Sequence, residues 1–145
     1  MIVYLDSSIL ARAYLVDELG HHEAVAVLRN PDNTIVTGSW TRIEVTGALI
    51  RSARARRRDE ADLLAALEAD ITSRIIVLVD AMQAEIEGLA LTIVRRYAIR
   101  AMDAWHLACA SLALSELSEP GEERGFATRH SEQAAVAREL GFATL

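Results

Sequence analysis

Three acidic residues stand where a carboxylate could reach a shared ligand. Asp6 ends the first apolar run of the chain, Glu44 lies one turn into a predicted helix, and Asp103 opens a later apolar helix. Residues just past the carboxyl ends of parallel strands converge on one rim of the sheet, where ligands collect. Carboxylates gathered there repel one another, and a hard cation such as Mg²⁺ removes that repulsion. The three acids together predict a metal site that activates water for attack on a phosphodiester.

Each of these acids also has an ordinary structural explanation. Asp6 can cap the helix that follows it, and Asp103 can complement the dipole at its own helix N-terminus. Glu44 completes the pattern Thr41–Glu44 (T-R-I-E), a capping box in which the glutamate bonds the helix start. Asp80 also ends an apolar run, and we assign it a capping role and no chemistry. A single acid of this kind favours a cap, whereas three acids on one rim favour a metal site.

The acids need a framework that brings distant segments together, and strand-like and helix-like segments alternate along the chain. The predicted strands are 2–5, 34–38, 75–79 and 125–128, with 142–145 as a candidate fifth. The predicted helices run from Ser7 or Ser8 to Tyr14 and over 19–28, 41–53, 59–71, 81–97, 102–114 and 131–140. Continuous apolar strands indicate a sheet that is covered on both faces. We expect one α/β domain over 1–145, a three-layer fold around a mostly parallel sheet of four to five strands.

The overall composition narrows the class of protein. The 145 residues, 52% of them hydrophobic, can form a sizeable core, and no apolar run is long enough to span a membrane. No signal-peptide pattern precedes the first strand, so we expect a cytoplasmic protein that has no membrane partner. The net charge of −6 argues against coating nucleic acid by bulk attraction. The single cysteine, Cys109, excludes an internal disulfide and is expected to be a small buried hydrophobe.

Four segments of the sequence resemble a known family. They are Val3–Ser8 (VYLDSS), Ser39–Glu44 (SWTRIE), Arg100–Ala108 (RAMDAWHLA) and Phe126–Arg129 (FATR), followed by a last helix that ends at Leu140-Gly141. In this order they resemble the PIN-domain ribonucleases, specifically the VapC-type toxins of bacterial toxin–antitoxin pairs. The resemblance covers nearly the whole chain.

The resemblance implies an α/β fold and hydrolysis of RNA, often at one tRNA or rRNA site, with Mg²⁺ or Mn²⁺ held by an acid cluster. Asp6, Glu44 and Asp103 match its three main acidic positions. Ser7 and Thr128 match small polar positions beside the first and the fourth acid. The resemblance also implies a homodimer and a cognate VapB-like antitoxin, and an arginine of the antitoxin could pair with the carboxylates.

The sequence departs from the family pattern at the fourth acid. The family often has Asp two residues after the threonine, or Asn there with Asp three residues further on; these positions hold His130 and Gln133. Glu132 lies between them in a different register. We expect reduced or altered metal affinity at this site, and His130 could ligate Mn²⁺ or donate to a phosphate oxygen. The alternative is a weakened or inactive PIN-like module that binds RNA or an antitoxin without cutting.

The dense arginine cluster has two interpretations, which stay open. Its members follow the helix that carries Glu44 and are Arg51, Arg54, Arg56, Arg57 and Arg58. Such a run is usually a solvated helix end, where positive charge complements the helix dipole. Beside a nuclease site, the same arginines could grip RNA phosphates.

The remaining aromatic and imidazole side chains are expected to be structural. His106 lies on an apolar helix and is expected to be a buried histidine with satisfied hydrogen bonds. Trp40 and Trp105 could stack on bases, but we favour core or interface roles for them.

A phosphatase of the haloacid dehalogenase type also begins with a strand-end aspartate. That family needs a second aspartate where this chain has Ser8, and a lysine, whereas all the cations of this chain are arginines. We therefore set this class aside.

Overall fold

A computed structural model describes residues 1–79 and 81–145; Asp80, the acid to which we assigned a capping role, lies outside the described residues. The strands are β1 (Ile2–Leu5), β2 (Thr34–Gly38), β3 (Val77–Val79), β4 (Arg124–Ala127) and β5 (Ala143–Thr144). The helices are α1 (Ser7–Tyr14), α2 (His21–Arg29), α3 (Ser39–Arg56), α4 (Glu60–Thr72), α5 (Gln83–Tyr97), α6 (Ala101–Leu117) and α7 (Ser131–Glu139). Every strand and helix expected from the sequence is present, and the α/β class is confirmed.

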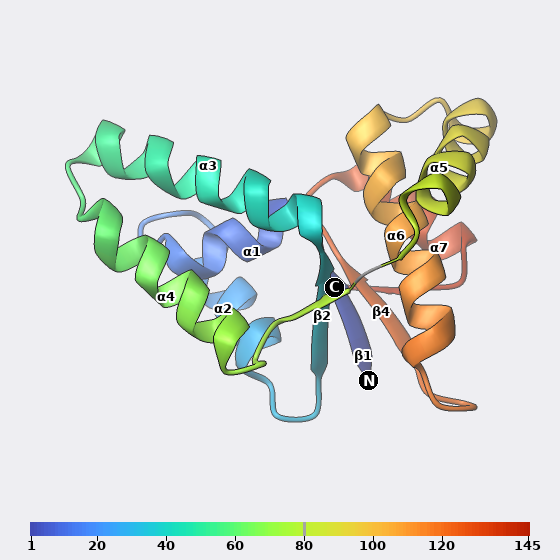
Figure 1. Ribbon diagram of the computed structural model, residues 1–145, viewed down its shortest axis with the longest axis horizontal. Helices are drawn as coiled ribbons and strands as arrows, with labels where there is room; N and C mark the ends of the chain where they lie inside the picture. Colours follow the sequence, from blue (N-terminus) through green and yellow to red (C-terminus); the bar gives the residue numbers. More distant parts are fainter. Residues whose placement is uncertain (80) are drawn as a thin grey trace.

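The five strands form one all-parallel sheet in the order β3-β2-β1-β4-β5. The central strand is β1, where Ile2 pairs with Thr34 of β2 on one side and with Arg124 of β4 on the other. From β1 the chain passes outward through β2 and β3, then crosses back to form β4 and β5 (Figure 1). The strand order therefore reverses beside β1, and such a switch point is where open α/β sheets bind ligands.

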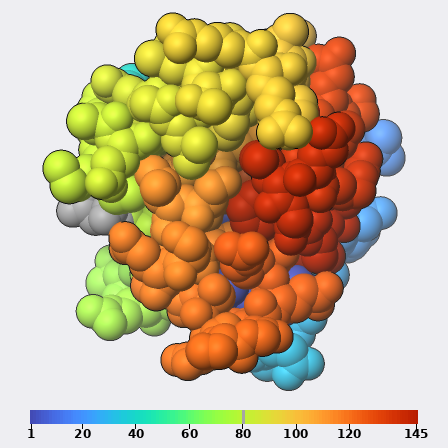
Figure 2. Space-filling model, turned by 90° about the vertical axis from the view of Figure 1, so that its right-hand side faces the viewer, coloured from blue at the N-terminus to red at the C-terminus, as the bar shows by residue number. Residues whose placement is uncertain are grey.

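Helices cover both faces of the sheet, which confirms the three-layer arrangement. Helices α1 to α4 lie on one side and α5 to α7 on the other (Figure 1), and Figure 2 shows the second side from outside. Alternate residues of β1 enter the two cores: Ile2 and Tyr4 pack with α5, α6 and α7, and Val3 and Leu5 pack with α1 to α4. Because both faces of β1 are buried, its sequence is apolar throughout and does not alternate with polar residues.

The helix that carries Glu44 begins earlier than expected. It starts at Ser39, with Gly38 as its N-cap, and Thr41 is buried inside the helix. The capping-box explanation of Glu44 is therefore wrong, because the Glu44 carboxylate contacts His106 of α6 instead of the helix start. The acid stands one turn further into α3, where its side chain can reach across the rim of the sheet.

No helix within 1–79 and 81–145 has both the length and the apolar character needed to cross a lipid bilayer. Cys109 is a free, buried thiol on α6, as expected, and burial raises its pKa to about 11.

Candidate active site

Asp6 lies at the switch point of the sheet, directly after β1. Its side chain caps α1, as the capping explanation of Asp6 expected, and the helix starts at Ser7. Oδ2 accepts hydrogen bonds from the Ser8 N–H at 3.1 Å and from the Ser8 hydroxyl at 2.5 Å. Burial of the residue, which is 1% exposed, and these two hydrogen bonds to Oδ2 hold the carboxylate in place. The other oxygen, Oδ1, faces His106.

The two serines after Asp6 line one groove but differ in their hydrogen bonds. Ser8 bonds Asp6 and accepts a hydrogen bond from the Arg129 N–H at 3.1 Å, so it ties α1 to the end of β4. Ser7, the residue expected beside the first acid, faces a groove, and its hydroxyl makes no hydrogen bond to any described residue. The small polar neighbour of the Asp6 carboxylate is therefore Ser8.

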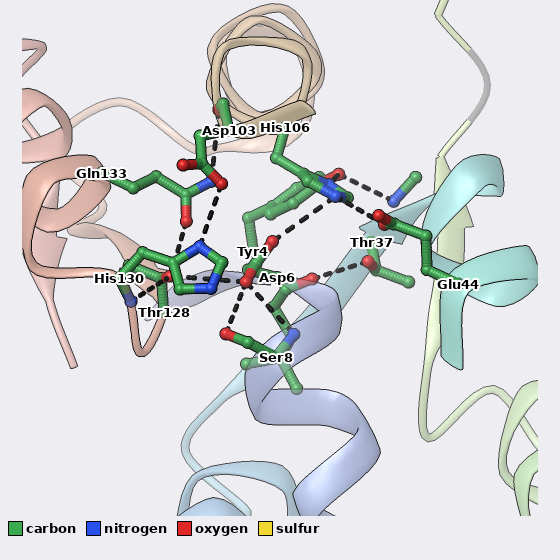
Figure 3. A network of polar contacts seen from close by, with 12 residues as sticks. Tyr4, Asp6, Ser8, Thr37, Glu44, Asp103, His106, Thr128, His130 and Gln133 are labelled. Carbon is green, nitrogen blue, oxygen red and sulfur yellow. Dashed lines mark hydrogen bonds and ion pairs between the residues drawn. The ribbon is translucent and has the colours of Figure 1, made fainter. Parts of the chain in front are cut away.

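His106 of α6 lies between Asp6 and Glu44 (Figure 3). Its Nε2 is 2.7 Å from Oε2 of Glu44 and 3.4 Å from Oδ1 of Asp6. The side chains of Asp6 and His106 are each 2% exposed, whereas that of Glu44 is 30% exposed. Sequence reasoning left His106 outside the site, although its i+3 spacing from Asp103 places both residues on one helix face.

A chain of hydrogen bonds runs from β2 through Tyr4 and His106 to Glu44. The Gly38 N–H donates to the Tyr4 hydroxyl oxygen at 3.2 Å, and this oxygen lies 3.0 Å from Nδ1 of His106. Burial, followed by the neighbouring Cys109, raises the pKa of Tyr4 well above its ordinary value, so the phenol keeps its proton. Nε2 faces the carboxylates of Glu44 and Asp6, which only accept, so Nε2 carries a proton, and the phenol can donate to Nδ1. His106 then donates to Glu44, which confirms a buried histidine with satisfied hydrogen bonds.

Asp103 lies on the other side of Asp6 from Glu44 and points toward His130 (Figure 3). Oδ1 of Asp103 is 2.9 Å from Nδ1 of His130. The Asp103 side chain is 9% exposed and the His130 side chain 44% exposed. The residue that replaces the fourth acid is thus the partner of the third acid.

Thr128 and Gln133 join the end of β4 to α6 and α7. The Thr128 hydroxyl lies 2.5 Å from Oε1 of Gln133 and 3.3 Å from Oδ2 of Asp6, so its single proton is donated mainly to Gln133. Gln133 is fully buried, and its amide nitrogen donates to the backbone oxygen of Asp103 at 3.2 Å. Gln133 therefore serves as a packing residue that fixes the start of α6.

The side chains of this rim fit a divalent cation in their chemistry, although not in their present pairing. Within the described ranges, no three His, Cys, Asp or Glu side chains are placed to hold one metal ion. Glu44 bonds His106, and Asp103 bonds His130. Carboxylate oxygens are nevertheless the ligands that Mg²⁺ prefers. Asp6 and Glu44, which already face one imidazole, could share a cation with the least rearrangement.

A groove of about 680 Å³ opens beside Glu44 and runs between α1 and α3. Three arginines line it, Arg12, Arg51 and Arg129. None of them forms an ion pair with another described residue, and Nε of Arg12 is buried without a hydrogen-bond partner there. Ser52, which also lines the groove, has a buried hydroxyl that is unpartnered in the same sense. Two acids also line the groove, but Glu18 pairs with Arg56 and Glu44 contacts His106. The unpaired arginines and unsatisfied polar atoms therefore suit this groove to an anionic ligand.

The structure divides the arginine cluster that follows Glu44. Only Arg51 of this cluster lines the groove. The others pair with acids or end the helix: Arg54 with Glu60, Arg56 with Glu18, Arg58 with Asp17, and Arg57 at the left-handed C-cap of α3. The solvated-helix-end interpretation therefore describes most of the cluster, whereas Arg51 stays a candidate for contact with RNA.

The fold and the rim define an α/β domain whose ligand site is built from acids at the switch point of a parallel sheet. A family model for the PIN domain matches residues 3–117, and the chain belongs to this family. PIN domains are generally nuclease domains and typically depend on a divalent metal. The matched segment contains Asp6, Glu44 and Asp103, whereas Thr128 and His130 follow it. A search of curated proteins finds no match.

Proposed function

We propose that this protein is a metal-dependent endoribonuclease of the VapC toxin type. The observation that supports it best is that Asp6 and Glu44 face one imidazole at the mouth of a groove lined by unpaired arginines. Phosphates that flank the cleaved bond would lie against Arg12, Arg51 and Arg129, and the cleaved phosphodiester would lie beside the carboxylates. The charge pattern matches a substrate that is anionic along its length and reacts at one phosphate.

Asp6 and Glu44, joined by Asp103 when it leaves His130, would hold Mg²⁺ or Mn²⁺. When bound, the metal would supply an activated water and stabilise the negative charge that develops on the phosphate oxygens. The residues of the chain do the positioning. The cap of α1 fixes the Asp6 carboxylate, and the hydrogen bond from His106 orients Glu44.

Cleavage of single-stranded RNA with Mg²⁺ or Mn²⁺ tests this proposal, comparing wild type with Asp6→Asn. Asparagine is as good an N-cap as aspartate, so the variant keeps the helix start and loses the charge. We expect its cleavage rate to fall by at least about 100-fold. Loss of a residue that only supports a metal ligand costs up to about 100-fold in activity, and loss of a ligand itself should cost more. Equal cleavage by the two proteins would contradict the assignment.

Asp59 provides the matched control for this substitution. It caps α4 by accepting hydrogen bonds from the backbone N–H groups of Ala61 and Asp62. Asp59→Asn makes the same chemical change at another helix cap, so we expect it to leave cleavage unchanged. A similar loss in both variants would show that a weakened cap, and not a missing metal ligand, lowers the activity.

The toxin part of the proposal adds partners. A VapB-like antitoxin would insert an arginine between Asp6 and Glu44, where it would replace the metal as the cation. The toxin would act in the cytoplasm as a homodimer. Coexpression with the short protein encoded beside it tests this pairing, with a stable complex and suppressed RNA cleavage as the expected result. Purification of the two proteins apart, with full activity, would contradict the toxin role.

One observation favours a second candidate function. Asp103 is paired with His130 at 2.9 Å, so the carboxylates that face the imidazole of His106 are those of Asp6 and Glu44. The site thus gathers two acids instead of the three or four that the family resemblance implies. This arrangement suits a PIN-like module that binds RNA or an antitoxin without cutting. His130→Asp discriminates, because it restores the usual fourth acid. Cleavage by this variant alone would support the binding module, whereas cleavage by the wild type supports the nuclease.

A further inference from the structure

Both tryptophans of the chain line one pocket, and one of them, Trp105, packs against His106 of the rim. The pocket, of about 290 Å³, lies between the start of α3 and the helices α5 and α6, and Trp40, Trp105, Met82, Gln83 and Ser39 are among its lining residues. Trp40 is 43% exposed and Met82 68% exposed, so of the core or interface roles favoured for Trp40 from the sequence the core role is wrong, and the interface role stays a prediction. Trp40 and Met82 together give this pocket an exposed apolar surface that a flat ligand could cover.

The two indole rings are held in a fixed arrangement. Their centroids are 6.5 Å apart at an interplanar angle of 76°, edge to face. Trp105 also packs edge to face against His106, at 5.3 Å between centroids. Gly38 makes this packing possible, because a Cβ there would lie 2.9 Å from the Trp105 ring. Trp105 thus forms a fixed side of the pocket, and Trp40 is the more exposed of the two rings.

The pocket continues the line of the arginine groove along α3. Trp40, Glu44 and Arg51 stand at positions i, i+4 and i+11, which lie on one face of a helix. With a rise of 1.5 Å per residue, Trp40 lies about 6 Å before Glu44 and Arg51 about 10 Å beyond it. One strand of nucleic acid laid along this face would meet an aromatic ring, a carboxylate and a cation in turn.

We propose that this pocket binds a nucleobase of the RNA, stacked on Trp40. The inference rests on the proposed function, since it places the base next to the phosphodiester held at Glu44. Aromatic side chains beside a positively charged groove are the means by which proteins hold unpaired bases. The succession of aromatic ring, carboxylate and cation along α3 favours RNA over a peptide as the ligand, because bases and phosphates lie side by side along a nucleic acid.

The rim of the pocket offers polar groups to the edge of the base. The Gln83 amide nitrogen donates to Glu87 at 2.8 Å, so its amide oxygen can accept from an amino group of a base. The hydroxyl of Ser39 can donate or accept. A base that carries an exocyclic amino group, that is adenine, cytosine or guanine, therefore fits the pocket better than uracil.

Tryptophan fluorescence tests the proposal directly, because both fluorophores line the pocket. The protein is titrated in EDTA, which prevents cleavage, with a fluorescein-labelled single-stranded RNA of mixed sequence, and separately with an abasic strand of the same length. We expect the RNA to quench the fluorescence and the abasic strand to leave it nearly unchanged. Trp40→Ala should weaken RNA binding by about 5- to 150-fold and leave binding of the abasic strand unchanged.

Two further variants separate stacking from damage to the fold. Trp40→Phe keeps an aromatic face and should bind RNA within about threefold of wild type, since phenylalanine also stacks on bases. Leu91→Ala removes an exposed apolar side chain from α5, outside the pocket-lining residues, and should bind RNA as the wild type does.

The outcomes separate this inference from the proposed function. Equal affinity of the wild type for RNA and for the abasic strand, without quenching, would overturn the base pocket and leave a nuclease that grips only phosphates. Failure to bind either strand would overturn both. A fluorescence change that depends on protein concentration without RNA would assign the pocket to a contact between copies of the chain, and would also overturn the base pocket.

Discussion

The imidazole of His106 donates a hydrogen bond to Glu44, with 2.7 Å between Nε2 and Oε2, although the two residues come from helices on opposite faces of the sheet. The same nitrogen lies 3.4 Å from Asp6. One buried imidazole nitrogen thus lies between two carboxylates. We expect His106→Leu to lower the free energy of unfolding by about 2–4 kcal/mol, because buried polar groups would lose their partner. Urea denaturation at neutral pH measures the change.

A conservative variant and a metal titration make this prediction specific. His106→Gln places an amide N–H near the position of Nε2, so it should recover part of the stability. In His106→Leu the two carboxylates face each other without a donor, and Mg²⁺ should therefore raise its melting temperature by more than it raises that of the wild type. Equal metal responses of the two proteins would show that Asp6 and Glu44 do not share a cation.

The Asp70 carboxylate is predicted to stabilise the fold without a role in cleavage. It is 6% exposed, receives two hydrogen bonds from Arg29 at 2.9 and 2.7 Å, and accepts one from the Tyr14 hydroxyl at 2.7 Å. Asp70→Asn would break this buried, charge-assisted network and should cost about 2–4 kcal/mol. The control is Glu68→Gln, which breaks the exposed pair with Arg42 and should cost less than about 1 kcal/mol. Thermal or urea unfolding that ranks the two variants in the opposite order would contradict the prediction.

Arg51 and Arg54 are predicted to differ in their contribution to RNA binding. Arg51 lines the groove beside Glu44, whereas Arg54 forms an exposed ion pair with Glu60 at 3.3 Å. Arg51→Ala should remove one phosphate contact and reduce the slope of log affinity against log salt by about 0.7, the value for a single strand. Arg54→Ala should leave the slope unchanged. Equal slopes for both variants, measured by fluorescence anisotropy in EDTA, would show that the groove does not track the RNA backbone.

Stability is predicted to fall at alkaline pH. Burial raises the pKa of Cys109 to about 11, and burial also raises the pKa values of Tyr4 and Tyr14 above their ordinary range. The thiol of the unfolded chain loses its proton at about pH 8.5. The stability that comes from keeping Cys109 protonated in the fold is therefore fully present below that pH and is lost as the pH rises toward 11. At pH 10 this effect of Cys109 lowers the free energy of unfolding by an amount on the order of 2 kcal/mol.

Urea denaturation between pH 7 and pH 10 measures this loss. Cys109→Ala removes the thiol and should show a smaller decrease over that range than the wild type. The folded protein should also react slowly with iodoacetamide at pH 8, since the thiolate is the reactive form. Rapid alkylation without unfolding would contradict the raised pKa.

Local patterns of the sequence were enough to predict the framework. Apolar runs bounded by turn residues predict β1 and its neighbours, and the continuous apolar sequence of β1 indicates a sheet covered on both faces. The helix starts were less well predicted. Thr41-to-Glu44 satisfies the capping-box pattern, yet α3 begins at Ser39, because packing that buries Thr41 outweighs a local side-chain bond.

The sequence by itself determined which residues stand near the rim: Asp6, Glu44 and Asp103 each follow from the order of strands and helices. Only the tertiary structure decided their partners, since it set His106 against Glu44 and His130 against Asp103. The physical reason is one of scale. Hydrophobic periodicity specifies which face of an element is buried, whereas a hydrogen bond requires two atoms to lie within about 3 Å at a suitable angle. That precision comes from strand order, register and side-chain packing together, and no local stretch of sequence carries it.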